Sequence, residues 1–141
     1  MKTPTFLLTI LIAVIAVTAV GNELAIRSTA SGVQFQELAS GRGDAVGPGD
    51  VVTIHFIAWI ETDGNKGNII FNSYEQDNPV TFKLGTDKVI QGWNDVVTGM
   101  KPGEIRLSFI PHDLAYGDKS LGDMLPANTD LIYEIELIGV K

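Results

Sequence analysis

The feature that most constrains the fold is a strict alternation of apolar and polar residues in three separate segments. The apolar positions are Val52, Ile54, Phe56, Ala58 and Ile60, then Ile105, Leu107 and Phe109, and finally Leu131, Tyr133, Ile135 and Leu137. The intervening positions include Thr53, His55, Trp59, Glu104, Arg106, Ser108, Glu134 and Glu136. Because successive side chains of a strand point to opposite faces, each apolar set is predicted to face a core. Such strands are typical of an antiparallel sheet with one solvated face.

Shorter strand signals and one helical pattern complete the predicted domain. Strand material is predicted at residues 33–36, 69–71 and 80–84, and Asp63-Gly64 predicts a hairpin turn. A helical stripe is formed by Ile90, Trp93, Val97 and Met100. The helix is predicted to be capped by Thr86 or Asp87 and to end at Gly99 and Pro102. The predicted fold class is α+β, a curved antiparallel sheet wrapped around one short helix.

Length and composition limit the number of domains and the class of partner. The 141 residues have room for one hydrophobic core and a short leader. A formal net charge of -7 argues against nucleic acid as a partner, because phosphate binding requires a basic face. Since the chain contains no cysteine, it has neither a disulfide framework nor a thiolate nucleophile.

The first residues have the pattern of a targeting segment. Lys2 precedes an uncharged apolar run at residues 6–20, which is shorter than the roughly 18 residues that a membrane-spanning helix requires. Residues 1–21 are predicted to be a signal peptide cut near Ala19 or Gly21, and the alternative is an uncleaved membrane anchor. Residues 22–30 are predicted to be a linker and residues 31–141 the folded domain. In either case we expect an exported, periplasmic or otherwise extracytoplasmic domain, with membrane contact only through an uncleaved leader.

The motifs of common enzyme classes are missing from the sequence. There is no GxSxG elbow, P-loop or GxGxxG segment, which argues against hydrolase, kinase and dehydrogenase functions. His55 lies on the polar face of a strand and His112 in a loop, so both are predicted to be solvated and neither a metal site nor a cofactor is expected. Aromatic residues gather near the ends of elements: Phe56, Phe71, Phe82, Trp93, Tyr116 and Tyr133. Their pattern alone favours an ordinary core over a ligand pocket.

Six short motifs say more about function than the pattern of aromatic residues does. They are Val89-Ile90-Gln91-Gly92-Trp93, Gly99-Met100-Lys101-Pro102-Gly103-Glu104, Ile110-Pro111, Leu114-Ala115-Tyr116-Gly117, Leu125-Pro126-Ala127-Asn128-Thr129 and Tyr133-Glu134-Ile135-Glu136-Leu137. In order and spacing they resemble the FKBP family, from about Ser31 to Val140. Within the family, the chain resembles most the exported bacterial FKBPs of the Mip type. The segments that carry this likeness are Gly32-Val33-Gln34 and Ser73-Tyr74-Glu75.

The resemblance implies a pocket that holds a proline ring. Trp93 would form its floor, and its walls would be Phe71, Phe82, Val89, Ile90 and Tyr133. Tyr116 and Leu125 would lie at the rim, on the long loop between the last two strands. The resemblance also implies that the Tyr116 hydroxyl and the Ile90 N–H donate hydrogen bonds to bound carbonyl groups.

Several positions depart from the family pattern. Phe56 and Asn72 stand where most active members have a Tyr and an Asp that bond to each other, so the level of activity is an open question. Tyr133 replaces the usual Phe, and its hydroxyl is expected either to reach water at the pocket edge or to make the pocket more polar. Leu121 is expected to make the rim more apolar, and the hairpin at residues 61–70 is longer than in minimal members.

The resemblance implies a peptidyl-prolyl cis-trans isomerase, or rotamase, that assists the folding of exported proteins. Its partners would be proline-containing polypeptides, and macrolide inhibitors of the family would bind to the same pocket. The alternative is a weakly active or inactive FKBP-like chaperone that holds peptides without isomerising them. A purely structural envelope protein is a third interpretation, and it predicts no peptide binding.

Overall fold

The computed structural model describes residues 25–141, and the predicted signal peptide lies outside them. The strands are β1 (Arg27–Ser28), β2 (Gln34–Ala39), β3 (Val51–Thr62), β4 (Asn65–Asn72), β5 (Val80–Lys83), β6 (Ile105–Ile110) and β7 (Leu131–Val140). The helix is α2 (Gln91–Val97), and the 3-10 turns are η3 (His112–Leu114) and η4 (Gly122–Met124). The two residues of β1 lie within the predicted linker and pair with β2.

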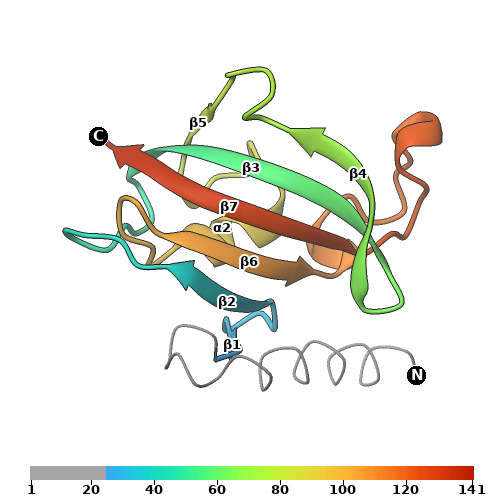
Figure 1. Cartoon of the computed structure of the whole chain (residues 1–141), viewed down its shortest axis with the longest axis horizontal. Coiled ribbons are helices and arrows are strands. Elements are labelled where there is room, and N and C mark those ends of the chain that lie inside the picture. The colour runs from blue at the N-terminus through green and yellow to red at the C-terminus, as the bar shows by residue number, and fades with distance from the viewer. Residues whose placement is uncertain (1–24) are drawn as a thin grey trace.

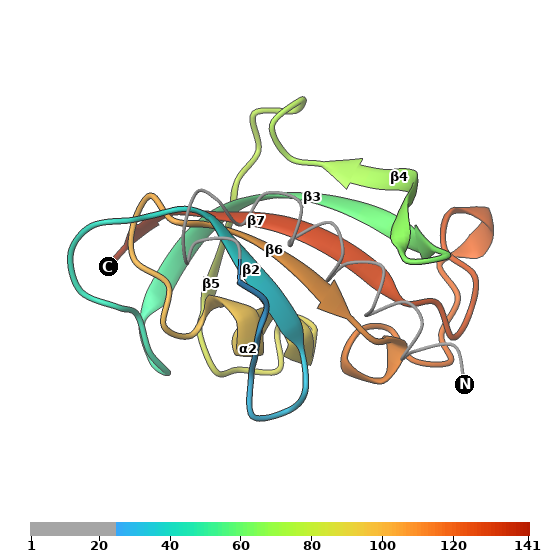
Figure 2. The ribbon, with the colours of Figure 1, turned by 60° about the horizontal axis from the view of Figure 1, so that its bottom comes forward.

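One antiparallel sheet carries the whole domain. Its strand order is β1-β2-β6-β7-β3-β4, and β5 pairs with the other end of β3. Figure 1 shows α2 behind β6 and β7, and Figure 2 shows the helix below the curved sheet, on one side of it. The core lies between the helix and this inner face, so the predicted fold class is confirmed.

The two long central strands follow the predicted alternation. In β3 the residues Val52, Ile54, Phe56 and Ala58 are buried, and in β7 the residues Leu131, Tyr133, Ile135 and Leu137 are buried. Asp63 and Gly64 both have positive φ angles, 51° and 86°, which is the geometry of a tight hairpin turn between twisted strands. β4 begins directly after this turn, four residues before the predicted strand.

The face of β6 was predicted wrongly. The residues that β6 turns toward the helix are Arg106, Ser108 and Ile110, and all three are buried. Leu107 and Phe109 instead pack on the outer face, where they meet Trp59 and Ile132. The register explains the reversal, because Ser108 pairs with the inward Tyr133.

Arg106 faces inward because the end of α2 requires hydrogen-bond donors there. Its Nη1 donates to the Val96 carbonyl at 2.7 Å, and its Nε donates to the buried carboxylate of Glu104. The other oxygen of that carboxylate accepts the backbone N–H of Lys101 at 2.9 Å. The carbonyl groups at the C-terminal end of a helix lack intrahelical partners, so a buried guanidinium with a paired carboxylate satisfies them without an uncompensated charge.

The helix is shorter than predicted. It begins at Gln91, and neither Thr86 nor Asp87 caps it, because the Thr86 hydroxyl donates to a carbonyl of β5 instead. The buried amide of Asn94 holds the preceding turn from within the helix. Its Oδ1 accepts the Gly85 N–H at 2.8 Å, and its Nδ2 donates to the Thr86 carbonyl at 2.6 Å. The segment that leads into α2 is therefore fixed by a side chain of the helix itself.

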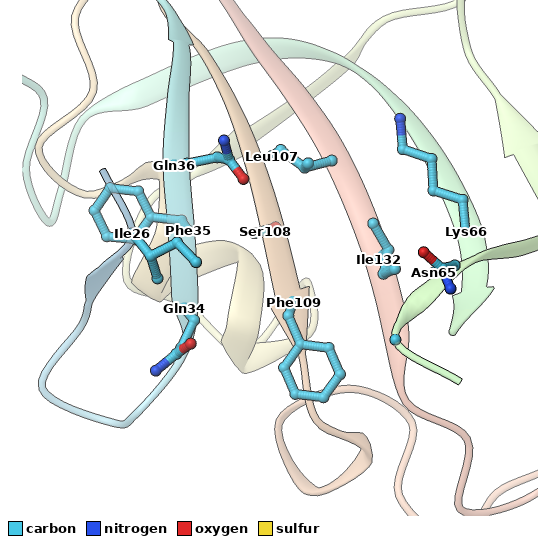
Figure 3. A pocket seen from close by; sticks show the side chains of 11 residues that line it. Ile26, Gln34, Phe35, Gln36, Asn65, Lys66, Leu107, Ser108, Phe109 and Ile132 are labelled. Atoms are coloured by element: carbon cyan, nitrogen blue, oxygen red, sulfur yellow. The ribbon is translucent and has the colours of Figure 1, made fainter. Parts of the chain in front are cut away.

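The outer face of the sheet has an apolar patch of its own. A hollow of about 410 Å³ lies over β2, β6 and β7, where Figure 3 shows Leu107, Phe109 and Ile132 side by side. The ammonium group of Lys66 lies 4.1 Å from the centre of the Trp59 ring beside it. Between residues 25 and 141 we find no helix with the length and apolarity needed to span a membrane.

Candidate functional site

Five aromatic rings from five elements meet on the inner side of the sheet. They are Phe56 of β3, Phe71 of β4, Phe82 of β5, Trp93 of α2 and Tyr133 of β7. The Trp93 ring lies 4.7 Å from that of Phe56 and 5.7 Å from that of Tyr133, between centroids. Phe82 lies 5.8 Å from Trp93, and Phe71 stacks on Phe56 at 5.1 Å. The sequence therefore identified residues that the fold does bring together.

A hollow of about 660 Å³ opens beside Trp93. It lies between the segment that leads into α2 and the loop that follows β6. Four of the predicted site residues line it: Val89, Ile90, Trp93 and Tyr116. The indole is only 7% exposed, yet it borders this open space. A slot that admits a small ring and shields it from water has this combination of burial and access.

Other predicted site residues lie behind the hollow. Phe56, Phe82 and Tyr133 are buried in the aromatic cluster, and Phe71 is half-buried. Leu125 was expected at the rim, but it is buried in the main core. The exposed apolar side chains of the same loop are Leu121 and Met124.

The loop that carries Tyr116 is held at its base by Asp130. One oxygen of that carboxylate accepts the His112 backbone N–H at 2.8 Å and lies 2.9 Å from the Nδ1 of the same residue. The His112 carbonyl accepts the Gly117 N–H at 2.7 Å, and the Gly117 carbonyl accepts the Asn128 N–H at 2.7 Å. His112, predicted to be solvated, is therefore half-buried and fixes the backbone on both sides of Tyr116.

The other side of the hollow offers a backbone donor. Ile90 is extended just before α2, and its carbonyl accepts the Trp93 N–H at 3.0 Å. The Ile90 N–H itself has no hydrogen-bond partner among residues 25–141. A backbone donor that borders a hollow is available to a ligand carbonyl.

Tyr133 is almost completely buried beside the Trp93 indole. The residue is 2% exposed, and its ring meets the Trp93 indole edge-on, at 86°. Burial raises the pKa of Tyr133 well above its ordinary value, and the nearby Tyr116 hydroxyl raises it further.

Phe56 and Asn72 do not form a polar wall. The Asn72 Oδ1 accepts the backbone N–H of Tyr74 at 3.0 Å, so its amide stabilises the turn after β4. The hydroxyl of the fully buried Ser73 accepts the Phe56 N–H at 2.7 Å and lies 2.7 Å from the Nδ1 of His55. Sequence reasoning missed this role of Ser73, because a serine beside a predicted turn gives no sign of its depth.

Comparisons with known proteins agree with this geometry. Residues 43–138 match the family described as FKBP-type peptidyl-prolyl cis-trans isomerase. The chain is 37% identical over 94 residues to "Peptidyl-prolyl cis-trans isomerase FPR2" of Saccharomyces cerevisiae, a match that covers 67% of each chain. It is 34% identical over 124 residues to "Peptidyl-prolyl cis-trans isomerase Mip" of Coxiella burnetii, covering 88% of this chain and 51% of Mip.

A solved structure extends the likeness to three dimensions. The crystal structure of AtFKBP13 superposes with a TM-score of 0.71 at 29% identity, over 83% of this chain and 99% of the other. Both the fold and the sequence matches therefore confirm the predicted isomerase class. The chain belongs to the FKBP-type peptidyl-prolyl cis-trans isomerase family.

Proposed function

We propose that this chain accelerates rotation about Xaa-Pro bonds in exported proteins and so assists their folding. The observation that carries the proposal is the open hollow in which the Trp93 indole, the Tyr116 side chain and the Ile90 N–H converge. Trp93 would be the floor on which the proline ring lies. Phe56, Phe82 and Tyr133 support the indole from behind.

Such a pocket is sufficient for the reaction, because no proton has to leave the substrate. The barrier of roughly 18–20 kcal/mol arises from loss of amide resonance as the bond twists. An apolar slot removes water from the amide, and oriented donors favour the twisted form over the planar one. In our proposal, Tyr116 and the Ile90 N–H orient the carbonyl of the residue before proline.

The proposal is tested by protease-free NMR exchange on a Xaa-Pro peptide. We expect the chain to accelerate cis-trans exchange, and we expect both Trp93→Leu and the macrolide FK506 to abolish the effect. Relatives named FK506-binding protein motivate this choice of inhibitor. No rate gain at high protein concentration would refute the enzyme.

A second candidate function is a chaperone that binds peptides with little or no isomerisation. It is favoured by Phe56, which has no hydroxyl, and by Asn72, whose Oδ1 is used by the Tyr74 N–H. The double substitution Phe56→Tyr with Asn72→Asp separates the two candidates. A large gain in rate with unchanged peptide affinity supports the chaperone, whereas an already high wild-type rate supports the enzyme.

The export part of the proposal depends on residues 1–21. Their apolar run and small residues favour a cleaved signal peptide, and the likeness to a bacterial Mip protein is consistent with it. Intact-mass measurement of the protein purified from its native cells decides the question. A mass equal to that of a chain beginning near residue 20 or 22 supports cleavage, and the mass of the full-length chain supports the membrane anchor.

A further inference from the structure

A second hollow, the outer hollow, lies on the face of the sheet that is turned away from α2. Its volume of about 410 Å³ is within the range of roughly 300–1,000 Å³ that is typical of ligand pockets. Leu107 of β6 and Ile132 of β7 line it with apolar side chains. Because the sheet separates it from the hollow beside Trp93, a ligand of the outer hollow does not compete with a prolyl group.

One polar side chain of the outer hollow is buried without a partner. Gln36 of β2 is only 9% exposed, and its side-chain amide has no hydrogen-bond partner among residues 25–141. Figure 3 shows this amide directed from β2 across β6, toward Leu107. Buried polar groups in folded proteins are almost always hydrogen-bonded, so a buried amide that faces a hollow indicates a ligand with complementary groups.

The chemistry of that amide selects the kind of group that it binds. A glutamine side chain donates through its nitrogen and accepts through its oxygen, whereas a carboxylate ligand only accepts and would leave the Gln36 oxygen unpaired. An extended residue of a polypeptide offers an N–H and a C=O on the same side, as it does to its partner in an antiparallel sheet. One such residue satisfies both ends of the Gln36 amide.

The charge of the outer hollow favours an uncharged ligand. Lys66 is the one charged residue among the described residues that line it. Its ammonium lies 3.8 Å from the Glu134 carboxylate and 4.1 Å from the centre of the Trp59 ring, so its charge is already compensated. The hollow beside Trp93 is instead lined by two aspartates and two lysines, Asp87, Lys88, Asp113 and Lys119. The outer hollow is therefore complementary to a neutral, apolar segment.

We propose that the outer hollow is a second binding site, which holds an uncharged, apolar segment of an unfolded polypeptide. The Gln36 amide donates to the carbonyl of one extended residue and accepts the N–H of the same residue. A neighbouring apolar side chain of the segment lies over Leu107 and Ile132. The inference goes beyond the proposed isomerase and does not depend on it, because the site takes no proline and lies on the other face of the sheet.

The binding test uses the peptide acetyl-Ser-Leu-Ser-Leu-Ser-amide, which is uncharged and contains no proline. Two-dimensional NMR of the full-length protein distinguishes the two hollows, because one of the two tryptophans lies on each side of the sheet. We expect the peptide to move the indole N–H signal of Trp59, which packs against Ile132, and the side-chain amide signals of Gln36. The Trp93 signal should stay in place. Trp59→Phe and Gln36→Met assign these signals by their loss.

Gln36→Met keeps the length of the side chain and removes the amide. We expect it to raise the Kd of the peptide about two- to tenfold, the effect of one neutral hydrogen bond. The matched control is Gln34→Met, two residues earlier on β2, because the Gln34 Nε2 already donates to the Ser28 hydroxyl at 3.4 Å. Its Kd should be unchanged. An unaltered Trp93 signal shows that each variant is folded.

Three results would overturn the proposal. An unchanged Kd in Gln36→Met, or an equal loss in both variants, means that the Gln36 amide does not bind the peptide. Movement of the Trp93 signal alone places the peptide in the other hollow. No movement of any signal in the full-length protein means that the outer hollow is closed to the peptide, as it would be if residues 6–20 of the same chain filled it. A protein that binds the peptide but accelerates no Xaa-Pro exchange refutes the enzyme and supports the second site.

Discussion

At the residue scale, the phenol of Tyr133 is buried, so its ionised form is poorly solvated. Burial is the main reason that its pKa lies well above the ordinary value, and the Tyr116 hydroxyl adds to the rise. The hydroxyl therefore keeps its proton at an alkaline pH at which an ordinary tyrosine ionises. The same shift links the stability of the domain to alkaline pH.

The direction of that linkage follows from the raised pKa. The unfolded chain releases the Tyr133 proton near pH 10, whereas the folded chain keeps it. The contribution of Tyr133 to stability is thus fully present below about pH 10 and is lost as pH rises toward the folded pKa. We expect Tyr133→Phe to reduce the alkaline slope of the unfolding free energy by up to about 1.4 kcal/mol per pH unit. Urea unfolding between pH 8 and 11 measures it.

Tyr74 provides the comparison for this prediction. Its pKa is also raised, first by burial and then by Glu136, but its side chain is far more exposed. We therefore expect Tyr74→Phe also to reduce the alkaline slope over the same pH range. Coincident curves for wild type and Tyr133→Phe would contradict the assigned shift.

The sequence predicted several residues that line the hollow, but it did not predict how deeply each candidate side chain is buried. Trp93, Tyr116 and Ile90 occur in short motifs whose spacing survives folding, and all three line the hollow. Leu125 and Tyr133 occur in equally clear motifs, yet both are buried behind it. Depth depends on which elements pack over a side chain, and no local pattern records that.

At the element scale, the contact between β6 and α2 depends on a buried ion pair. The Arg106 and Glu104 side chains are 7% and 4% exposed, and the guanidinium also donates to the Val96 carbonyl. We expect Arg106→Met to lower the unfolding free energy by about 3 kcal/mol, because it leaves the Glu104 carboxylate buried without a cation. Urea unfolding at neutral pH gives the value.

The matched control removes both charges. Arg106→Met combined with Glu104→Gln leaves no unpaired charge, so we expect it to recover part of the stability that Arg106→Met loses. If the double variant is less stable than Arg106→Met by the full cost of a second deletion, the charge explanation fails.

The interactions between Asp130 and His112 at the base of the long loop give a second prediction at this scale. Asp130→Ala removes the acceptor of both His112 hydrogen bonds, whereas Asp130→Asn keeps an oxygen in the same place. We expect Asp130→Ala to accelerate amide hydrogen exchange at residues 113–129 and to lower kcat/KM, because Tyr116 loses its fixed position. Asp130→Asn should show much smaller effects. Equal exchange in the two variants would mean that the carboxylate charge, and not the hydrogen bonds, holds the loop.

Alternation predicted the strands themselves better than it predicted their orientation. Both faces of β6 are covered by other residues. Leu107 and Phe109 pack in a cluster on the outer face, and Arg106 and Ser108 are buried on the inner face. A polar residue on a strand is expected to face solvent, and that expectation fails where a helix end requires donors. The predicted start of α2 was wrong for a related reason. The buried Asn94 amide fixes the turn before the helix, which a capping side chain was expected to fix.

At the scale of the whole molecule, the site depends on long-range pairing. The segment 87–91 and the loop 113–119 face each other across the hollow, although β6 and a helix separate them in the sequence. Their positions follow from the order in which β6, β7 and β3 lie in the sheet. Periodicity alone gave no such order, so only the resemblance to a family predicted that these loops meet.

Because the hollow exists only in the folded chain, its ligand should stabilise the whole domain. A compound that binds the native state alone adds about 2.7 kcal/mol at a concentration 100-fold above its Kd, and such a gain raises Tm by several degrees. We expect FK506 to produce this rise in the wild type and in Trp59→Phe, whose tryptophan lies on the outer face.

Trp93→Leu should lose the response, because the substitution removes the floor on which the ligand lies. Each variant is compared with its own Tm without ligand, so any loss of intrinsic stability from Trp93→Leu does not enter the result. Scanning fluorimetry at several FK506 concentrations measures the shift without reference to isomerase activity. An equal rise in wild type and Trp93→Leu would place the ligand elsewhere on the domain and would remove the main support for the pocket.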